Sequence, residues 1–269
     1  MAQLSRILVL SPEDFLAWWS RAWGQGEHVT IAALTGSGKS TLGAFLVSVR
    51  KWVLALDAKG MDSTLSALGW PRVGKWPLPY QMRDAIKNNE PCRVIIGRKC
   101  NSDKEFEKNA ALMRQALAGA WSQGRWVVWA DEGQLLADRR YGDAGERLEK
   151  MLIAARDRGI SLVFTVQRVA IGRSTPSATA AYTQSTWLFV ARTRDTHVAD
   201  RLAEIAGRPA AEMRGLISSL PKYWWACLGL DPHEPIRLVK PPKLGRRAPQ
   251  ERANQTSKLT QFLWGQQSA

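Results

Sequence analysis

A glycine-rich segment at residues 33–41 constrains the fold of this chain more than any other part of the sequence. It reads Ala-Leu-Thr-Gly-Ser-Gly-Lys-Ser-Thr and follows an apolar run at residues 29–34. It leads into a largely apolar segment that ends at Val49 and is expected to be a helix. A strand, a glycine-rich loop and a helix in this order are the context in which Gly-Lys-Ser indicates phosphate binding. The loop N–H groups and the positive helix end would surround the phosphates of a nucleotide. The segment therefore predicts an α/β domain that binds ATP.

Two side chains of this loop have specific expected roles. Lys39 would reach the β and γ phosphates, and the Ser40 hydroxyl would bind Mg²⁺. Ala33 departs from the usual pattern, which has a glycine there, but alanine is small and we expect the loop to form. The other residues expected to contact the nucleotide are Thr35, Gly36, Ser37, Gly38 and Thr41.

A second apolar run, within residues 125–132, ends in two carboxylates, Asp131 and Glu132. Buried parallel strands read as such runs, and ligands gather at their C-terminal ends. Asp131 would coordinate Mg²⁺ through water, and Glu132 would polarise the attacking water as a general base. Without the P-loop, the same pattern would indicate a strand that ends in two solvated acids. The paired carboxylates favour hydrolysis over phosphoryl transfer to a small molecule.

A third short apolar run, within residues 159–168, ends at Gln167. A glutamine at the end of such a strand can contact the γ-phosphate and orient the hydrolytic water through both halves of its amide. A glutamine after a strand is more often an ordinary loop residue. The interpretation of Gln167 as a sensor therefore depends on the P-loop.

Three blocks together resemble the HerA/FtsK branch of P-loop ATPases: residues 28–41, the Asp131-Glu132 end and residues 154–168. That branch comprises hexameric DNA translocases, conjugative coupling ATPases and genome-packaging ATPases of membrane-containing viruses. Its members have a strand-opening histidine before the P-loop, as His28 is here. The resemblance covers roughly residues 25 to 206 and is specific to the superfamily, but not to one biological process.

Two further segments bear on this resemblance. The sequence Asp57-Ala58-Lys59-Gly60 is similar to the Asp-x-Lys-Gly segment that follows the second strand of many members. The sensor strand of members ends in Thr-Gln or a close variant, and here Val166 separates Thr165 from Gln167. The resemblance implies a RecA-like P-loop NTPase domain with a mostly parallel central sheet flanked by helices. We expect an N-terminal helical segment at 1–26, this domain at 27–239 and a short basic, proline-containing tail at 240–269.

The resemblance also implies an arginine finger that acts across a subunit boundary. Arg156 lies where the finger is expected, and Arg158 is its close competitor. A guanidinium is always charged and planar, and it can bind the γ-phosphate through paired hydrogen bonds. Arg192 and Arg194, which follow an apolar run at residues 187–191 that reads as another strand, resemble a second basic sensor of some members. Most arginines, however, simply lie on solvated helix faces.

The charge of the chain favours an anionic partner. There are 38 Lys and Arg residues against 24 Asp and Glu, which gives a formal net charge of +14. Such an excess favours the phosphate backbone or anionic surfaces, although charge spread over the surface for solubility is the alternative. In a ring, the loops after the second and third apolar runs would contact double-stranded DNA without reading its sequence. The candidate contacts are Arg139, Arg140 and Arg173.

Several absences place the chain in the cytoplasm. No stretch approaches 18 apolar residues and no signal-peptide pattern opens the sequence, so no transmembrane segment is expected. Cys92, Cys100 and Cys227 form no C-x-x-C pair, which indicates neither a zinc site nor a disulfide framework.

A helix that begins at Ser11 carries an aromatic stripe, for which packing is a more expected use than partner binding. Residues 223–228 read as an edge strand, and residues 236–239 as another.

These features predict a ring-forming, hexameric, ATP-driven motor that translocates double-stranded DNA. Viral genome packaging or mobile-element transfer is the expected setting, with a capsid, membrane-protein or transfer-apparatus partner. This last step rests on analogy, since one fold hosts many functions. A nucleotide-switched assembly or binding protein without translocation is the alternative. A small-molecule kinase is a third hypothesis, but the sequence shows no acceptor pocket or lid for it.

Overall fold

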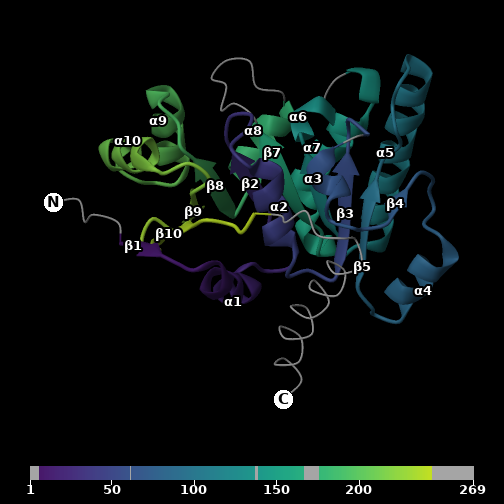
Figure 1. The fold of residues 1–269 in the computed structure, drawn as a ribbon, viewed down its shortest axis with the longest axis horizontal. Coiled ribbons are helices and arrows are strands. Elements are labelled where there is room, and N and C mark those ends of the chain that lie inside the picture. Colours follow the sequence, from purple (N-terminus) through teal and green to yellow (C-terminus); the bar gives the residue numbers. More distant parts are fainter. Residues whose placement is uncertain (1–5, 61, 137–138, 167–175, 244–269) are drawn as a thin grey trace.

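A ten-stranded sheet forms the centre of the computed structural model, which describes residues 6–60, 62–136, 139–166 and 176–243 (Figure 1). Its strands are β1 (Ile7–Val9), β2 (Val29–Ala32), β3 (Trp52–Asp57), β4 (Arg72–Val73), β5 (Cys92–Ile96), β6 (Val127–Asp131), β7 (Ser161–Val166), β8 (Trp187–Ala191), β9 (Trp225–Gly229) and β10 (Ile236–Val239). They lie in the order β1-β10-β9-β8-β2-β7-β6-β3-β5-β4. All neighbours from β8 to β4 are parallel, and β9 is antiparallel to both β8 and β10. The predicted mostly parallel sheet is therefore confirmed.

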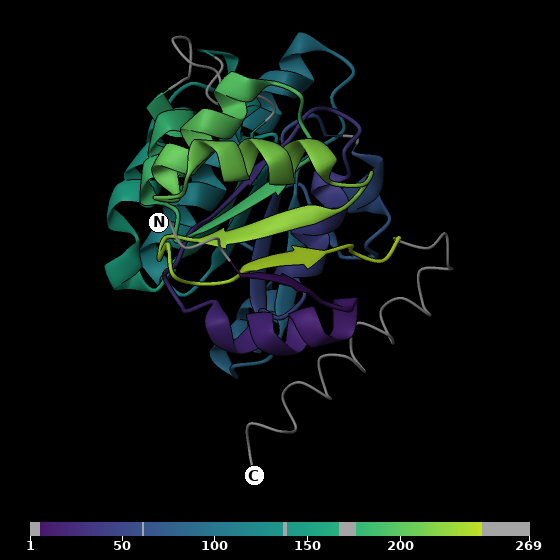
Figure 2. The ribbon, with the colours of Figure 1, turned by 90° about the vertical axis from the view of Figure 1, so that its left-hand side faces the viewer.

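Helices cover both faces of this sheet (Figures 1 and 2). They are α1 (Pro12–Ala22), α2 (Lys39–Val47), α3 (Ser63–Ser66), α4 (Tyr80–Lys87), α5 (Asp103–Gln123), α6 (Gly133–Leu136), α7 (Ala144–Ala154), α8 (Pro176–Gln184), α9 (Thr196–Ile205) and α10 (Ala210–Ser219), with 3₁₀ turns η1 (Arg139–Tyr141) and η2 (Arg156–Arg158). Helices α1, α2 and α3 pack on one face, and α5, α7, α8, α9 and α10 pack on the other. The predicted α/β class follows from these three layers.

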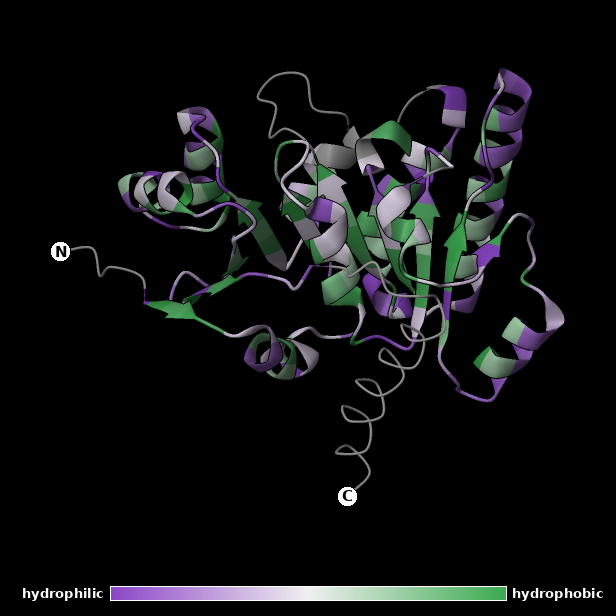
Figure 3. Ribbon diagram, in the orientation of Figure 1, coloured by the Kyte–Doolittle hydropathy of each residue, from purple (hydrophilic) through white to green (hydrophobic). Residues whose placement is uncertain are grey.

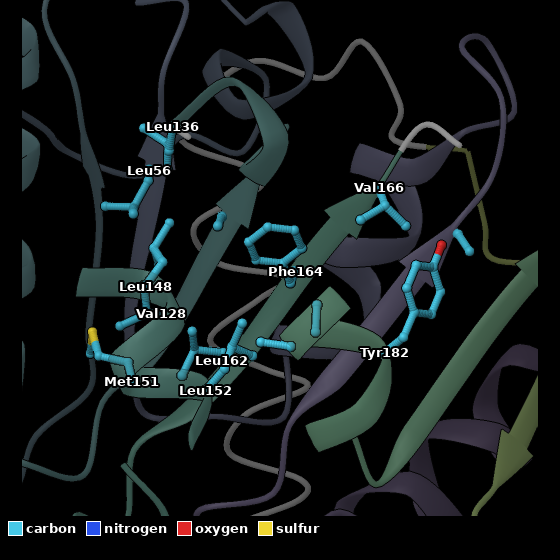
Figure 4. Packing of buried hydrophobic residues seen from close by; sticks show 14 of the residues in the cluster. Leu56, Val128, Leu136, Leu148, Met151, Leu152, Leu162, Phe164, Val166 and Tyr182 are labelled. Atoms are coloured by element: carbon cyan, nitrogen blue, oxygen red, sulfur yellow. The ribbon is translucent and has the colours of Figure 1, made fainter. Parts of the chain in front are cut away.

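The side chains of the central strands alternate between two apolar cores, because successive residues of a strand point to opposite faces. In β3, Leu54 and Leu56 join the core under α5 and α7, whereas Val53 and Ala55 join the core under α1 and α2. Figure 4 shows part of the first core, where Phe164 of β7 lies among side chains from neighbouring strands and from α7. The central strands are accordingly apolar along their length (Figure 3).

Helix α2 approaches β6 closely because it has a glycine at the contact. A Cβ atom at Gly43 would lie 2.6 Å from Cε2 of Trp129, a buried residue of β6. The missing side chain lets the helix backbone pack directly on the indole ring. This contact sets the position of the helix that follows the glycine-rich loop relative to the strand that carries the two carboxylates.

The N-terminal segment is joined to the same sheet. Strand β1 pairs with β10, and α1 begins as predicted, with the Ser11 side chain accepting a hydrogen bond from Asp14 N at 3.1 Å. The aromatic stripe packs inward: Phe15 and Trp19 are buried, and Trp19 Nε1 donates to the carbonyl of Leu46 in α2 at 3.2 Å. Packing is thus the use of this stripe, while the division of the chain into domains stays a prediction.

The predictions that residues 223–228 and 236–239 form edge strands were wrong. Strand β9 lies between β8 and β10, strand β10 lies between β9 and β1, and the residues of β9 are all buried. A strand covered on both faces and paired on both sides reads as a continuous apolar run, which does not reveal its place in the sheet.

The three cysteines are free. Within the described ranges, no helix combines the length and apolarity needed to cross a membrane.

Candidate nucleotide-binding site

The glycine-rich loop joins β2 to α2 at the C-terminal edge of the sheet, in the predicted strand-loop-helix order. The loop turns through Gly36 and Gly38, whose φ angles of 79° and 91° lie in the left-handed region that favours glycine. Helix α2 begins at Lys39, and no side chain of the described residues caps its start. The first N–H groups of a helix have no partner within the helix. They therefore present a row of donors to an anion at this edge.

The Lys39 ammonium lies inside the loop. Its Nζ donates to the carbonyls of Ala33 and Leu34 at 3.0 and 3.1 Å, so the loop forms with alanine at the position where glycine is usual. Burial lowers the pKa of Lys39, and the nearby carboxylates of Asp131 and Glu132 oppose this shift. Burial weakens the hydration of the charged form. A phosphate anion would compensate this ammonium for the water that it has lost.

Ser40 and Asp131 meet where the start of α2 faces the end of β6. The Ser40 hydroxyl donates to Asp131 Oδ2 at 2.8 Å. Burial raises the pKa of Asp131 to about 7, against the opposing effect of the Ser40 hydrogen bond. The other oxygen, Oδ1, is buried and accepts no hydrogen bond from the described residues. A buried polar atom without a partner is costly, so this oxygen fits a cation or the water bound to one.

The pair fits Mg²⁺ in particular. Hydroxyl and carboxylate oxygens are its preferred protein ligands, and it is bound through one or two side chains together with substrate phosphates. In the part of the chain that the structure describes, no three His, Cys, Asp or Glu side chains lie together as a metal cluster. A magnesium ion at Ser40 and Asp131 would therefore depend on the phosphates of a nucleotide.

The backbone of Glu132 is turned out of the strand. Its φ of 56° is in the left-handed region, which is uncommon for a residue with a side chain. Its N–H donates to Oγ1 of Thr165 at 2.7 Å, and Thr165 is a buried residue of the neighbouring strand β7. Unfavourable backbone conformations persist where the surroundings hold them, often at functional residues. Thr165 was not among the predicted site residues, and its position two residues before the expected sensor Gln167 was the signal for it.

The carboxylate of Glu132 is paired with Lys59. The two charged groups are 2.5 Å apart, and their side chains are 22% and 56% exposed respectively. An ion pair this exposed contributes about 0 to 1 kcal/mol of stability. Either group can therefore leave this ion pair for another partner with little loss of free energy. Lys59 was assigned no role from the sequence, although it belongs to the Asp-x-Lys-Gly segment.

Strong contacts fix the loop that carries Lys59. The buried Asp57 carboxylate accepts hydrogen bonds from the backbone N–H groups of Gly60 and Asp62 and forms an ion pair with Arg72 at 2.8 Å. The Tyr141 hydroxyl, from η1, donates to the carbonyl of Ala58. The Lys59 side chain thus extends from a turn that these contacts hold toward Glu132 at the end of β6.

His28, the residue just before β2, has a structural role. Its Nδ1 accepts a hydrogen bond from the backbone N–H of Leu162 at 3.1 Å, which ties the start of β2 to β7. Burial and the nearby Arg156 guanidinium lower the pKa of His28 to about 4. The imidazole is therefore neutral at pH 7 and positions the P-loop strand beside the strand that carries Thr165.

The two finger candidates lie at the opposite edge of the sheet. Arg156 donates to the carbonyl of Gln184 at 2.6 Å, and the guanidinium of Arg158 lies 4.7 Å from the ring centre of Trp121. Both precede β7, a strand of six residues, which separates them from the P-loop edge by about 20 Å. Neither can reach Lys39 of its own chain, so a finger role needs a neighbouring subunit and stays a prediction.

The remaining predicted residues are only partly described. Arg192 and Arg194 are exposed just after β8, at the same edge of the sheet as the P-loop. Arg140 is exposed in η1, with its guanidinium 5.0 Å from the ring centre of Phe106. The following predicted residues lie outside the described residues or have side chains outside them: Gln167, Arg173 and Arg139. Their sensor and DNA-binding roles stay predictions.

No protein-family model matches this chain, and no curated protein matches it. Solved structures do match. VirB4 of Thermoanaerobacter pseudethanolicus is 12% identical, with a TM-score of 0.56 over 83% of this chain and 90% of that one. At this identity the likeness shows the fold alone, which is RecA-like.

Two other solved structures are less similar. The pCW3 conjugation coupling protein TcpA, in its monomer form with ATPγS, is 15% identical, with a TM-score of 0.46 over 86% of this chain and 65% of that one. The cytoplasmic domain of the type VII secretion ATPase EccC of Thermomonospora curvata is 16% identical, with a TM-score of 0.48 over 81% of this chain and 25% of that one. This chain thus spans just under two thirds of the TcpA chain and a quarter of the EccC chain.

Proposed function

We propose that this chain is a Mg²⁺-dependent ATPase that works as a ring-forming motor on double-stranded DNA. One observation supports the ATPase part above all others. The Ser40 hydroxyl and the Asp131 carboxylate are hydrogen-bonded at 2.8 Å beside the uncapped start of α2, and one oxygen of Asp131 is buried without a partner among the described residues. An anion site and a hard-cation site are thus adjacent, as binding of Mg²⁺ and ATP requires.

Each residue has a distinct part in this proposal. The first N–H groups of α2 and the Lys39 ammonium bind the phosphates, and Ser40 and Asp131 hold Mg²⁺, which when bound neutralises charge on the β and γ phosphates. Glu132 accepts a proton from the water that attacks the γ-phosphorus, while the bond from that phosphorus to the bridging oxygen of ADP breaks. Thr165 holds the Glu132 backbone in the required turn.

Lys59 gives the proposed site a dependence on the γ-phosphate. Its ammonium pairs with the Glu132 carboxylate, which cannot accept a proton from water at the oxygen that is so engaged. Lys59 also lies near enough to Lys39 to lower its pKa. The γ-phosphate therefore offers Lys59 a second anionic partner, and an exchange to that partner would release Glu132 as the base.

The motor part of the proposal rests on charge and on the position of Arg156. The chain carries a net charge of +14, which favours binding to the DNA backbone without sequence recognition. Arg156 is exposed at the sheet edge away from its own P-loop, so it can complete a site only on the next subunit of an assembly. Packaging of a viral genome or transfer of a mobile element is the proposed setting.

Steady-state ATP hydrolysis, with and without duplex DNA, tests this proposal. Glu132→Gln removes the base and keeps the shape of the side chain, whereas Glu107→Gln makes the same change on an exposed residue of α5 and serves as the control. We expect DNA to raise turnover of the unaltered protein and of Glu107→Gln. Glu132→Gln should lose at least about 100-fold in kcat. Hydrolysis that survives Glu132→Gln would contradict the assignment of the base.

A nucleotide-switched assembly protein is the second candidate. The Lys59–Glu132 ion pair favours it, because a base that is held by a cation suits a protein that binds ATP and hydrolyses it slowly. Such a protein would need no DNA. Hydrolysis that DNA leaves unchanged over a range of salt concentrations would support the switch and exclude the motor.

A further inference from the structure

Tyr223 lies against the phosphate-binding loop although it is far from it in sequence. Strand β9 runs antiparallel to β8, and its first residue, Trp225, pairs with the last residue of β8, Ala191. The turn before β9 therefore lies at the same edge of the sheet as the P-loop. A Cβ atom added at Gly38 would lie 3.5 Å from Cδ1 of Tyr223, which is an ordinary van der Waals distance. The tyrosine ring therefore borders the space beside the loop into which a side chain at Gly38 would project.

The conformation and exposure of Tyr223 are unusual for a residue that serves packing alone. Its φ is 68°, a left-handed angle that disfavours residues with a Cβ atom, and the residue is 41% exposed. The turn is held by a hydrogen bond from Trp224 N to the carbonyl of Pro221 and by the buried Trp225. The Lys222 ammonium lies 4.9 Å from the centre of the tyrosine ring. The turn thus presents a ring and a cation beside the loop.

The order of the strands fixes the direction of a bound nucleotide. Ser40 and Asp131 mark the metal, and hence the β and γ phosphates, on the side of β2 where β7 and β6 lie. Strands β8 and β9 lie on the other side of β2. A nucleotide whose terminal phosphates point toward β6 has its base toward β8 and β9. Tyr223 lies on that side.

We propose that Tyr223 stacks on the base of the bound nucleotide. The inference rests on the proposed nucleotide site and adds to it the residue that binds the base. Stacking on an aromatic ring tolerates different bases, because each base has a π face. Tyr223 therefore distinguishes a nucleoside triphosphate from a triphosphate without a base, and it does not by itself distinguish adenine from guanine.

Affinities for two ligands test the assignment. Equilibrium binding of ATP and of inorganic tripolyphosphate, both with Mg²⁺, is measured by calorimetry on the full chain. Tyr223→Ala should weaken ATP binding by roughly 5- to 100-fold, the usual effect of removing a stacked ring, and should leave tripolyphosphate binding unchanged. Tyr223→Phe keeps the ring and should bind ATP as the unaltered protein does. Tyr80→Ala, on α4, removes another exposed tyrosine and is the control.

The outcomes separate this inference from the site on which it rests. Lys39→Ala should weaken both ligands, since it removes a phosphate contact. If Tyr223→Ala weakens both ligands equally, the ring supports the loop and does not bind the base. If it weakens neither while Lys39→Ala weakens both, the inference is wrong and the nucleotide site stands. If the unaltered protein binds neither ligand, the nucleotide site and the inference fail together.

Discussion

The raised pKa of Asp131 predicts a pH-dependent cost to the fold when metal and nucleotide are removed. Burial raises this pKa from 3.8 to about 7. The folded state therefore favours the protonated acid, and the stability that this gives is lost as the pH rises from about 4 to 7. Each pKa unit between the folded and unfolded states corresponds to about 1.4 kcal/mol, so ionisation of Asp131 lowers the free energy of unfolding by about 4 kcal/mol above pH 7, relative to its value below pH 4. At pH 5 this loss of stability is only about 1.5 kcal/mol.

Asp131→Asn removes this ionisation and keeps the size of the side chain. Its free energy of unfolding, minus that of the unaltered protein, should be about 2 to 3 kcal/mol more positive at pH 8 than at pH 5, so the variant is relatively more stable at the higher pH. The measurement is urea unfolding at both pH values in the presence of a chelator. Asp157→Asn, at an exposed position of η2, is the control and should show no such difference. An equal effect of Asp131→Asn at both pH values would show that the pKa of Asp131 is not raised in the folded protein.

Three other substitutions test separate contacts. Gly43→Ala should destabilise the protein by about 1 to 2 kcal/mol in urea unfolding, because the clash with Trp129 outweighs the better helix propensity; unchanged stability would contradict the close packing of α2. Thr165→Val should lower kcat about tenfold with little effect on ATP affinity, because it removes the hydroxyl that accepts the hydrogen bond from the Glu132 backbone. Thr165→Ser keeps this hydroxyl and should restore kcat, and a kcat that stays low in this variant would contradict the role of the hydrogen bond. Lys59→Met should weaken the binding of ATP but not of ADP in calorimetry, and an equal effect on both would exclude its contact with the γ-phosphate.

The local parts of the site could be predicted from the sequence. The P-loop was visible because its glycines, its lysine and its flanking apolar runs are adjacent in the chain. The Asp131–Glu132 end was visible because a strand buried on both faces gives an unbroken apolar run up to its last residue. The pairing of Ser40 with Asp131 then follows from the common edge at which parallel strands end.

The contacts between distant segments could not be predicted in this way. Strand β7 lies between β2 and β6, and only this order brings Thr165 to Glu132. The sequence of one strand does not specify its neighbour, because hydrogen bonds between strands use the same backbone groups in every pairing. The approach of Tyr223 to Gly38 and the interior position of β9 depend on the same strand order.

Displacement of a third strand from duplex DNA tests the motor claim most directly. A triplex-forming oligonucleotide is annealed to a duplex, and its release is followed after addition of the protein with Mg²⁺ and ATP. We expect the third strand to be released with ATP, but not by the Glu132→Gln variant and not with a slowly hydrolysed ATP analogue. Hydrolysis of ATP without release of the third strand, at salt concentrations where the protein binds the duplex, would contradict translocation.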